Sequence, residues 1–317
     1  MFNNKRFKNP HLDKAKRSFW NFFLWCLGFY KDRYPMAPPP KGFSYPGEEL
    51  YDPSKPSLTW INHSSFLIKM GELSFLTDPI FGKRCGPFLA PKRKHPPGIA
   101  IEGLPPLDFV LVSHNHYDHL ESKSVKALHK RFPELHWIVP KGLKKWFLRK
   151  GIQKVIELDW WEKIQFQKQG DTLTITAVPS QHFSGRGILD TNTTNWNGYV
   201  VEGEREKKAF YFVGDTGYNR EDFVKIGQQW NLDLALIPIG TYLPSAFMRP
   251  VHLSPKEAVQ IHKEIQAKKS VAMHWKTFRL SEEPMERPPY DLYLAMEKQN
   301  LDPKSFLVVE PGKHVNW

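Results

Sequence analysis

The stretch that decides the fold is Phe109-Val110-Leu111-Val112-Ser113-His114-Asn115-His116-Tyr117-Asp118-His119, an apolar run that leads directly into the pattern H-x-H-x-D-H. The run 109–112 predicts a strand. Because side chains two residues apart on an extended chain lie on the same side, His114 and His116 can bind one ion. Asp118 and His119 lie past the bend and can reach a second ion. The alternative interpretation is a solvated polar turn between a strand and a helix.

Three further candidate ligands each follow another predicted strand. His182 comes after the run 173–178, Asp215 after 209–213, and His274 after 270–273. Strand ends on one edge of a sheet are where α/β folds gather their active groups. The seven candidates therefore divide into two sets of three and one shared residue: His114, His116 and His182; Asp118, His119 and His274; and Asp215. A carboxylate has two oxygens and can bridge two ions, which an imidazole cannot do.

Imidazole and carboxylate are the ligands that Zn²⁺ or Fe takes where water is to be activated. We therefore expect two Zn²⁺ ions, with Fe or Mn as alternatives. The two cysteines, Cys26 and Cys85, form no C-x-x-C pair, which argues against a thiolate metal site or a disulfide framework. This cysteine usage favours a reducing compartment, and we expect a cytoplasmic protein.

Short apolar runs bounded by turn residues predict the other strands. They cover residues 58–61, 66–68, 73–77, 137–139 and 234–237. Helical spacing predicts a helix over 122–131, and Ser254-Pro255-Lys256-Glu257 predicts a second helix that begins with a capping box and proline at its first position. Residues 50–317 contain no repeat and no linker, so we expect one α/β domain of two sheets with flanking helices, long enough for a sizeable core.

Residues 1–49 are expected to form a separate N-terminal segment that ends in the stiff connector Met36-Ala37-Pro38-Pro39-Pro40. Within it, Phe19–Tyr30 is strongly apolar and follows Lys14, Lys16 and Arg17. This run is too short to span a bilayer, and no signal-peptide cleavage site follows it. An interfacial helix with basic flanks fits the pattern. A helix packed on the domain's own surface fits it equally, and both interpretations stay open.

The chain is basic, with 45 Lys and Arg against 33 Asp and Glu and a formal net charge of +12. The cations gather between residues 5 and 17 and again between 83 and 94. Such a field attracts anions, whether nucleic acid, lipid headgroups or phosphorylated metabolites. A merely solvated face is the alternative, and charge alone does not choose between them.

Longer motifs surround the candidate ligands. They are Trp60–Ile68, Ser113–Leu120, Glu157–Trp161, Pro179–Arg186, Gly214–Tyr218, Ile237–Tyr242 and His274–Phe278. Together they resemble the metallo-β-lactamase superfamily and, within it, the family of N-acyl-phosphatidylethanolamine-hydrolysing phospholipases D and their bacterial relatives. H-x-H-x-D-H specifies only the superfamily, whereas Gln-His-x-Ser-Gly-Arg and Ile-Pro-Ile-Gly-x-Tyr are far more particular. The resemblance implies an αββα sandwich: two mixed β-sheets flanked by helices, with metal ions at one edge.

The resemblance also implies a zinc phosphodiesterase of phospholipase D type. Such an enzyme hydrolyses N-acyl-phosphatidylethanolamine to phosphatidic acid and an N-acylethanolamine by attack of a metal-bridging hydroxide. Asp118 and Asp215 are then catalytic as well as ligating, with proton donation to the leaving group as a further role for Asp118. His252 is expected in the catalytic pocket; otherwise it is a polar residue near the cap of the next helix. Asp78, at a strand end, resembles the carboxylate that orients a metal-bound histidine.

The implied partners are a phospholipid substrate and an anionic membrane surface, met from the inner face of a membrane. We expect no nucleic-acid partner, and a homodimer stays open. A metallo-β-lactamase-fold nuclease with the same seven ligands and a lactone or ester hydrolase are the alternative functions, since one fold hosts many substrates. The chain departs from the family's usual sequence at Lys276, where glycine is usual, and over 192–197 and 243–248. These departures spare every ligand and lie where substrate would be bound.

Overall fold

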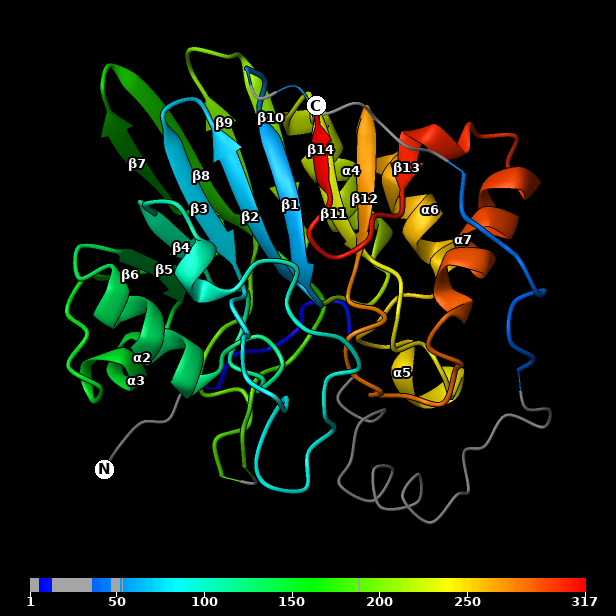
Figure 1. Cartoon of the computed structure of the whole chain (residues 1–317), viewed down its shortest axis with the longest axis horizontal. Helices are drawn as coiled ribbons and strands as arrows, with labels where there is room; N and C mark the ends of the chain where they lie inside the picture. The colour runs from blue at the N-terminus through cyan, green and yellow to red at the C-terminus, as the bar shows by residue number, and fades with distance from the viewer. Residues whose placement is uncertain (1–5, 13–35, 47–51, 53, 188) are drawn as a thin grey trace.

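The computed structural model describes residues 6–12, 36–46, 52, 54–187 and 189–317. Two seven-stranded sheets pack face to face, and helices cover both outer faces (Figure 1). This arrangement confirms the αββα sandwich of two mixed sheets. The apolar run over 19–30 and the cations at 14, 16 and 17 lie outside the described residues, so both interpretations of that segment stay predictions.

The first sheet contains the strand that precedes the histidine cluster. In spatial order its strands are β14 (His314–Asn316), β1 (Ser57–Asn62), β2 (Ser65–Met70), β3 (Leu73–Thr77), β4 (Phe109–Leu111), β5 (His136–Pro140) and β6 (Val155–Leu158). Neighbours from β14 to β3 pair antiparallel, and those from β3 to β6 pair parallel. The ends of β1, β3 and β4 therefore lie at the same edge of the sheet.

The second sheet carries the remaining candidate ligands. Its strands, in spatial order, are β13 (Phe306–Leu307), β12 (Lys269–Met273), β11 (Leu234–Pro238), β10 (Lys208–Phe212), β9 (Gly198–Gly203), β8 (Asp171–Val178) and β7 (Lys163–Lys168). Strands β10 to β13 are parallel and β7 to β10 antiparallel. As a result β8, β10, β11 and β12 all end at one edge.

Alternation along each strand separates two apolar layers. In β4, Phe109 and Leu111 belong to the core between the sheets, whereas Val110 packs beneath α2 (Ser122–Arg131) and α3 (Lys144–Leu148). The second sheet is covered by α4 (Arg220–Gln229), α6 (Pro255–Glu264) and α7 (Arg287–Lys298), and the short α5 (Ser245–Met248) precedes α6 (Figure 1). Within the part of the chain that is described, no helix is long and apolar enough to cross a bilayer.

The predicted elements are confirmed where the sequence pattern was strong. Helix α2 has the predicted bounds, and α6 begins with the predicted capping box, in which Ser254 Oγ accepts from the Glu257 N–H. Every predicted strand is present to within about two residues. Strands β6, β7, β9, β13 and β14 and helices α3, α4, α5 and α7 were not predicted. The predicted boundary at residue 50, between the N-terminal segment and the α/β domain, stays a prediction.

Candidate metal centre

His114, His116 and His182 converge at the edge where β4 and β8 end. His114 Nε2 lies 2.8 Å from His116 Nδ1, and His182 Nε2 lies 3.2 Å from the same atom. The backbone carbonyl of Val251 lies 2.9 Å from His182 Nδ1; since a carbonyl only accepts, that nitrogen carries the proton. The structure therefore brings together the first predicted set, with an unprotonated His182 Nε2 facing inward.

Ser113 fixes the protonation of His114 in the same way. Its Oγ donates to Asp78 Oδ2 at 2.5 Å and accordingly accepts from His114 Nδ1 at 2.8 Å. The Nε2 lone pairs of His114 and His182 then both point at His116 Nδ1. A single proton there cannot form two full hydrogen bonds, whereas a cation accepts all three lone pairs. This donor set fits a divalent metal.

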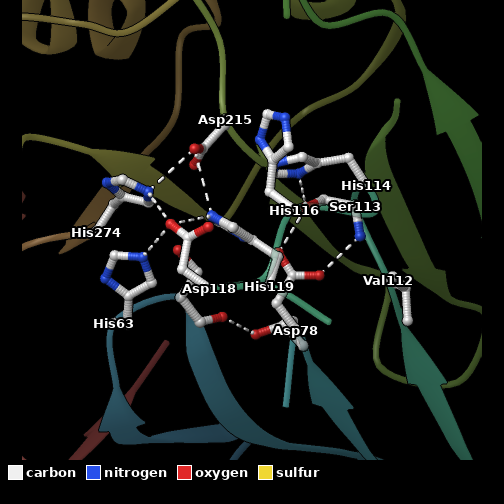
Figure 2. Close-up of polar contacts among 12 residues, drawn as sticks. His63, Asp78, Val112, Ser113, His114, His116, Asp118, His119, Asp215 and His274 are labelled. Atoms are coloured by element: carbon white, nitrogen blue, oxygen red, sulfur yellow. Dashed lines mark hydrogen bonds and ion pairs between the residues drawn. The ribbon is translucent and has the colours of Figure 1, made fainter. Parts of the chain in front are cut away.

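The second predicted set, Asp118, His119 and His274, lies beside the first (Figure 2). Asp118 Oδ2 is 3.4 Å from Nε2 of His119 and 3.4 Å from Nε2 of His274. Both Nε2 atoms are buried and face carboxylate oxygens at 3.0–3.4 Å, but they make no well-aligned hydrogen bond within the described residues. A buried polar atom is rarely left without a well-aligned partner. A second cation at this position would be such a partner.

Asp215 lies between the two sets, as predicted. Its Oδ2 is 3.0 Å from His274 Nε2, 3.3 Å from His119 Nε2 and 3.9 Å from His182 Nε2. The other oxygen, Oδ1, is buried without a hydrogen bond within the described chain. Figure 2 shows this carboxylate above the two groups of histidines. One carboxylate thus faces members of both sets.

His63, which follows β1, completes the second set and was not predicted. Its Nε2 lies 3.0 Å from Asp118 Oδ2, and its ring centroid lies 4.0 Å from that of His274. Burial, with the nearby His274, lowers the pKa of His63 to about 3, so the ring is neutral and Nε2–H donates to the carboxylate. Its sequence signal was weak: one histidine in the turn Asn62-His63-Ser64 with a left-handed φ of 45°.

His252 lies at the rim of the site. Its Nδ1 is 3.8 Å from Asp215 Oδ2, and its ring centroid is 5.3 Å from that of His182. The side chain is 13% exposed, against 0% for His182 and His274. It therefore reaches the ligands from the solvent side, where a substrate would approach.

The charges of the site are strongly coupled. Burial alone would lower the pKa of His119, but the carboxylates of Asp215, Asp118 and Asp78 outweigh it and hold that pKa well above its ordinary value. For His274, Asp215 and Asp118 overcome burial and raise the pKa to about 9. Burial would raise the pKa of Asp215, yet His119 and His274 hold it well below the usual range. In the metal-free protein, protons on His119 and His274 therefore offset the charge of the carboxylates.

Metal binding is therefore expected to release about two protons per chain near neutral pH, from His119 and His274. A raised pKa means that these protons are bound at pH 7, so the apparent metal affinity should weaken as the pH falls below about 9, the pKa of His274. Titration calorimetry of metal-free protein in buffers of different ionisation enthalpy measures the released protons. A binding enthalpy that is the same in every buffer would contradict this charge assignment.

Asp78, which follows β3, orients the second set as predicted by resemblance. Its Oδ2 lies 2.6 Å from His119 Nδ1, and its Oδ1 accepts from the Ser113 N–H at 2.7 Å. The carboxylate keeps one His119 proton on Nδ1, so the proton that metal binding releases comes from Nε2, and that nitrogen then faces Asp118 and Asp215 with its lone pair. Asp78 is fully buried, and burial raises its pKa although His119 opposes the shift.

Asp78→Asn is expected to weaken metal binding about 10- to 100-fold. The amide N–H of asparagine would face His119 Nδ1, drive the proton to Nε2 and so remove the lone pair from the site. Competition with a chromophoric chelator measures the affinity. Asp171→Asn, at a buried carboxylate where β8 begins, is the matched control and should leave the affinity unchanged. Equal affinities in the two variants would remove Asp78 from this role.

Lys276, one of the departures from the family's usual sequence, has a φ of 62°. This left-handed region favours glycine, the residue usual at this position, and costs another residue roughly 1–2 kcal/mol. The Lys276 ammonium pairs with Glu310 and lies 5.5 Å from the centroid of the Trp275 ring. The backbone is therefore in a conformation that glycine favours, and it carries a lysine side chain beside the site.

Comparisons with known proteins agree with the fold and assign the family. Residues 74–275 match the family model described as the Beta-lactamase superfamily domain. N-acyl-phosphatidylethanolamine-hydrolyzing phospholipase D 1 of Caenorhabditis elegans is 40% identical over 265 residues, which cover 80% of this chain and 74% of that protein. The mitochondrial N-acyl-phosphatidylethanolamine-hydrolyzing phospholipase D of Saccharomyces cerevisiae is 36% identical over 242 residues, covering 75% of this chain and 51% of that protein.

Among solved structures, an isothiocyanate hydrolase from Delia radicum gut bacteria matches with a TM-score of 0.64 at 19% identity. The match covers 82% of this chain and 99% of the hydrolase, and it supports the fold alone. The sequence matches go further, because they extend over most of the chain at much higher identity. The chain is thus a metal-dependent hydrolase of the β-lactamase fold, and it belongs to the family of N-acyl-phosphatidylethanolamine-hydrolysing phospholipases D.

Proposed function

We propose that this chain is a phosphodiesterase of phospholipase D type that hydrolyses N-acyl-phosphatidylethanolamine to phosphatidic acid and an N-acylethanolamine. The proposed cofactor is a pair of metal ions, with Zn²⁺ as the first candidate. The observation that supports the proposal most is the position of the Asp215 carboxylate, within 3.3 Å of His119 Nε2 and 3.9 Å of His182 Nε2. The names of the two phospholipase D relatives supply the substrate class.

In this proposal the residues of the first set and those of the second set would each hold one ion, with Asp215 placed to contribute to either. Such ions would supply the Lewis acidity that activates water and offsets charge on the phosphoryl oxygens. His63 donates to Asp118 and holds its carboxylate toward His119 and His274. Those two histidines keep the pKa of Asp118 well below the usual carboxyl range despite its burial. The ionised state suits a ligand better than a proton donor.

His252 is then the residue best placed to exchange a proton with the leaving alcohol, because it reaches the site from solvent. His252→Gln is expected to lower kcat by about 10²- to 10⁴-fold without changing the metal content. Steady-state kinetics and elemental analysis on the same preparation measure both quantities, with His129→Gln on α2 as the matched control. An unchanged kcat would leave His252 as a polar residue before the cap of α6.

The substrate class is tested with purified, metal-loaded protein on a panel of N-acyl-phosphatidylethanolamine, phosphatidylcholine, single-stranded RNA and lactones. We expect cleavage of the first compound at a kcat/KM far above the rest. Preferred cleavage of RNA or of a lactone would support the nuclease or the small-molecule hydrolase instead. The proposed setting is the surface of an anionic membrane, with the run 19–30 as a further candidate for contact with it.

A further inference from the structure

A hairpin over residues 83–93 leaves the fold beyond β3 and carries an apolar tip. Its base is closed by a 3.0 Å hydrogen bond from the Arg93 N–H to the Lys83 carbonyl. The turn over 87–90 is closed by a 2.8 Å hydrogen bond from the Ala90 N–H to the Pro87 carbonyl. Phe88 and Leu89 occupy this turn and are 84% and 89% exposed. Two large apolar side chains therefore stand in water at the end of a hydrogen-bonded hairpin.

A second loop, described over residues 185–187 and 189–191, presents another exposed apolar residue beyond β8. Leu189 is 86% exposed. The loop is closed by Asp190, whose Oδ1 accepts from the N–H groups of Arg186 at 3.0 Å and Gly187 at 2.7 Å. The Asp190 carboxylate of this loop is thus bound to N–H groups of the loop's own backbone, and the side chain that extends into solvent, Leu189, is apolar.

Both loops rest on Tyr117, which lies between the metal-ligand candidates His116 and Asp118. The Arg186 guanidinium lies 4.6 Å from the centroid of the Tyr117 ring. On the hairpin, a Cβ added to Gly86 would lie 3.5 Å from the Cβ of Tyr117, so the backbone packs directly against it. Figure 1 shows both loops, one cyan and one green, reaching past the sheets at the lower edge of the view. The apolar tips therefore flank the metal centre.

The surroundings of the hairpin tip are cationic. Residues 83–94 contain Lys83, Arg84, Lys92, Arg93 and Lys94, and no acidic residue occurs between 79 and 101. The Arg84 guanidinium lies 5.9 Å from the centroid of the Phe88 ring. An apolar tip on a hairpin rich in cations is complementary to a bilayer with anionic headgroups, into which such side chains insert while Lys and Arg stay at the surface.

We propose that these two loops dock the protein on an anionic lipid bilayer, with Phe88, Leu89 and Leu189 inserted below the headgroups. The tips protrude on two separate loops instead of forming a flat patch, which suits a fluid bilayer better than the face of another protein. The inference rests on the proposed function only for its purpose, because a lipid with three acyl chains must pass from the bilayer to the candidate ligands near Tyr117. The docking itself is independent of catalysis.

The test uses the full-length protein and sucrose-loaded vesicles of phosphatidylcholine with phosphatidylglycerol, free of N-acyl-phosphatidylethanolamine. Phe88→Ser combined with Leu89→Ser is expected to lower the vesicle partition coefficient at least about tenfold, because two large apolar side chains no longer insert. Leu189→Ser should lower it less. Leu294→Ser, at a 43% exposed leucine on α7 away from both loops, is the matched control and should bind like the wild type.

The cationic part is tested by Lys83→Glu combined with Lys92→Glu, which should remove the preference for anionic over neutral vesicles. A Phe88→Trp variant supplies a direct signal: its added fluorescence should shift to the blue on binding and be quenched by brominated acyl chains. Wild-type partitioning of the Phe88→Ser, Leu89→Ser variant would overturn the docking role. A wild-type dimer that this variant dissociates, seen by sedimentation equilibrium without vesicles, would assign the tips to a contact between copies instead.

Activity on a water-soluble short-chain N-acyl-phosphatidylethanolamine separates this inference from the proposed function. The tip variants should keep wild-type kcat/KM on that substrate, since none of the changed residues touches a ligand. Lost vesicle binding together with no hydrolysis by any form of the protein would leave the docking surface standing and refute the phospholipase assignment. If activity on the soluble substrate falls together with vesicle binding, the tips contribute to the active site, and docking is not independent of catalysis.

Discussion

Asp215→Asn is expected to abolish hydrolysis while the fold is retained, with a fall in kcat/KM of at least roughly 10³-fold, equivalent to about 4 kcal/mol of transition-state free energy. The carboxylate faces His119, His274 and His182 and therefore members of both candidate ligand sets. Asparagine has the same shape but no charge, so it cannot offset two dications. Kinetics on a soluble diester, metal content and a melting curve measure the effect.

Asp108→Asn is the matched control. Asp108 precedes β4 at the end opposite the site, where its carboxylate binds the Ser74 N–H at 2.8 Å and Lys168 at 2.9 Å. This variant should keep wild-type kcat/KM. Near-wild-type turnover in a folded Asp215→Asn protein would remove Asp215 from the shared position and with it the division of ligands into two joined sets.

Removal of metal is expected to have the second large effect, on both activity and stability. Chelation should reduce hydrolysis to background. It should also lower the free energy of unfolding by about 4 kcal/mol relative to protein at a free metal concentration of 1,000 times Kd. Chelation leaves inward-facing nitrogens of His114, His119 and His182 without a cation, in a site that is buried. Thermal unfolding with and without chelator, alongside elemental analysis, measures the change.

Restoration distinguishes metal loss from damage. Zn²⁺ added back should recover the melting temperature and the activity together, and substitution with Fe or Mn tests the alternative metals. The Asp215→Asn protein should show a smaller metal-dependent shift, because one ligand is neutral. A chelated protein that keeps its activity, or that melts at the same temperature as the untreated one, would contradict a metal centre at these residues.

The strand runs and the ligands that end them were predictable from the sequence because both obey local rules. An apolar run predicts a strand, and a histidine or aspartate that follows it within two residues is expected at the edge of the sheet. His114 follows Val112 in this way, and Asp215 follows Val213. Neighbouring strand ends then bring the side chains together. His182 and His274 add to this set only because the number and types of ligands are complete with them.

Other features depended on contacts between distant segments. His63 is one histidine in a turn, and its role requires Asp118, which lies 55 residues further along the chain. Strand β7 has the sequence Lys-Ile-Gln-Phe-Gln-Lys and lies at the edge of its sheet, so its weak apolar alternation is sufficient only because β8 pairs with it. The cations of 83–94 were visible as charge, but only the folded hairpin places Phe88 and Leu89 at its tip.

Hydrolysis of N-acyl-phosphatidylethanolamine in water enriched in ¹⁸O tests the central claim most directly. Purified, metal-loaded protein should yield phosphatidic acid and an N-acylethanolamine in equal amounts, with one ¹⁸O atom in the phosphate of the phosphatidic acid and none in the alcohol, as mass spectrometry of both products would show. This labelling follows from cleavage of the bond between phosphorus and the departing oxygen. Label in a released fatty acid or in the N-acylethanolamine, or no products from protein that carries its full complement of metal, would contradict the account.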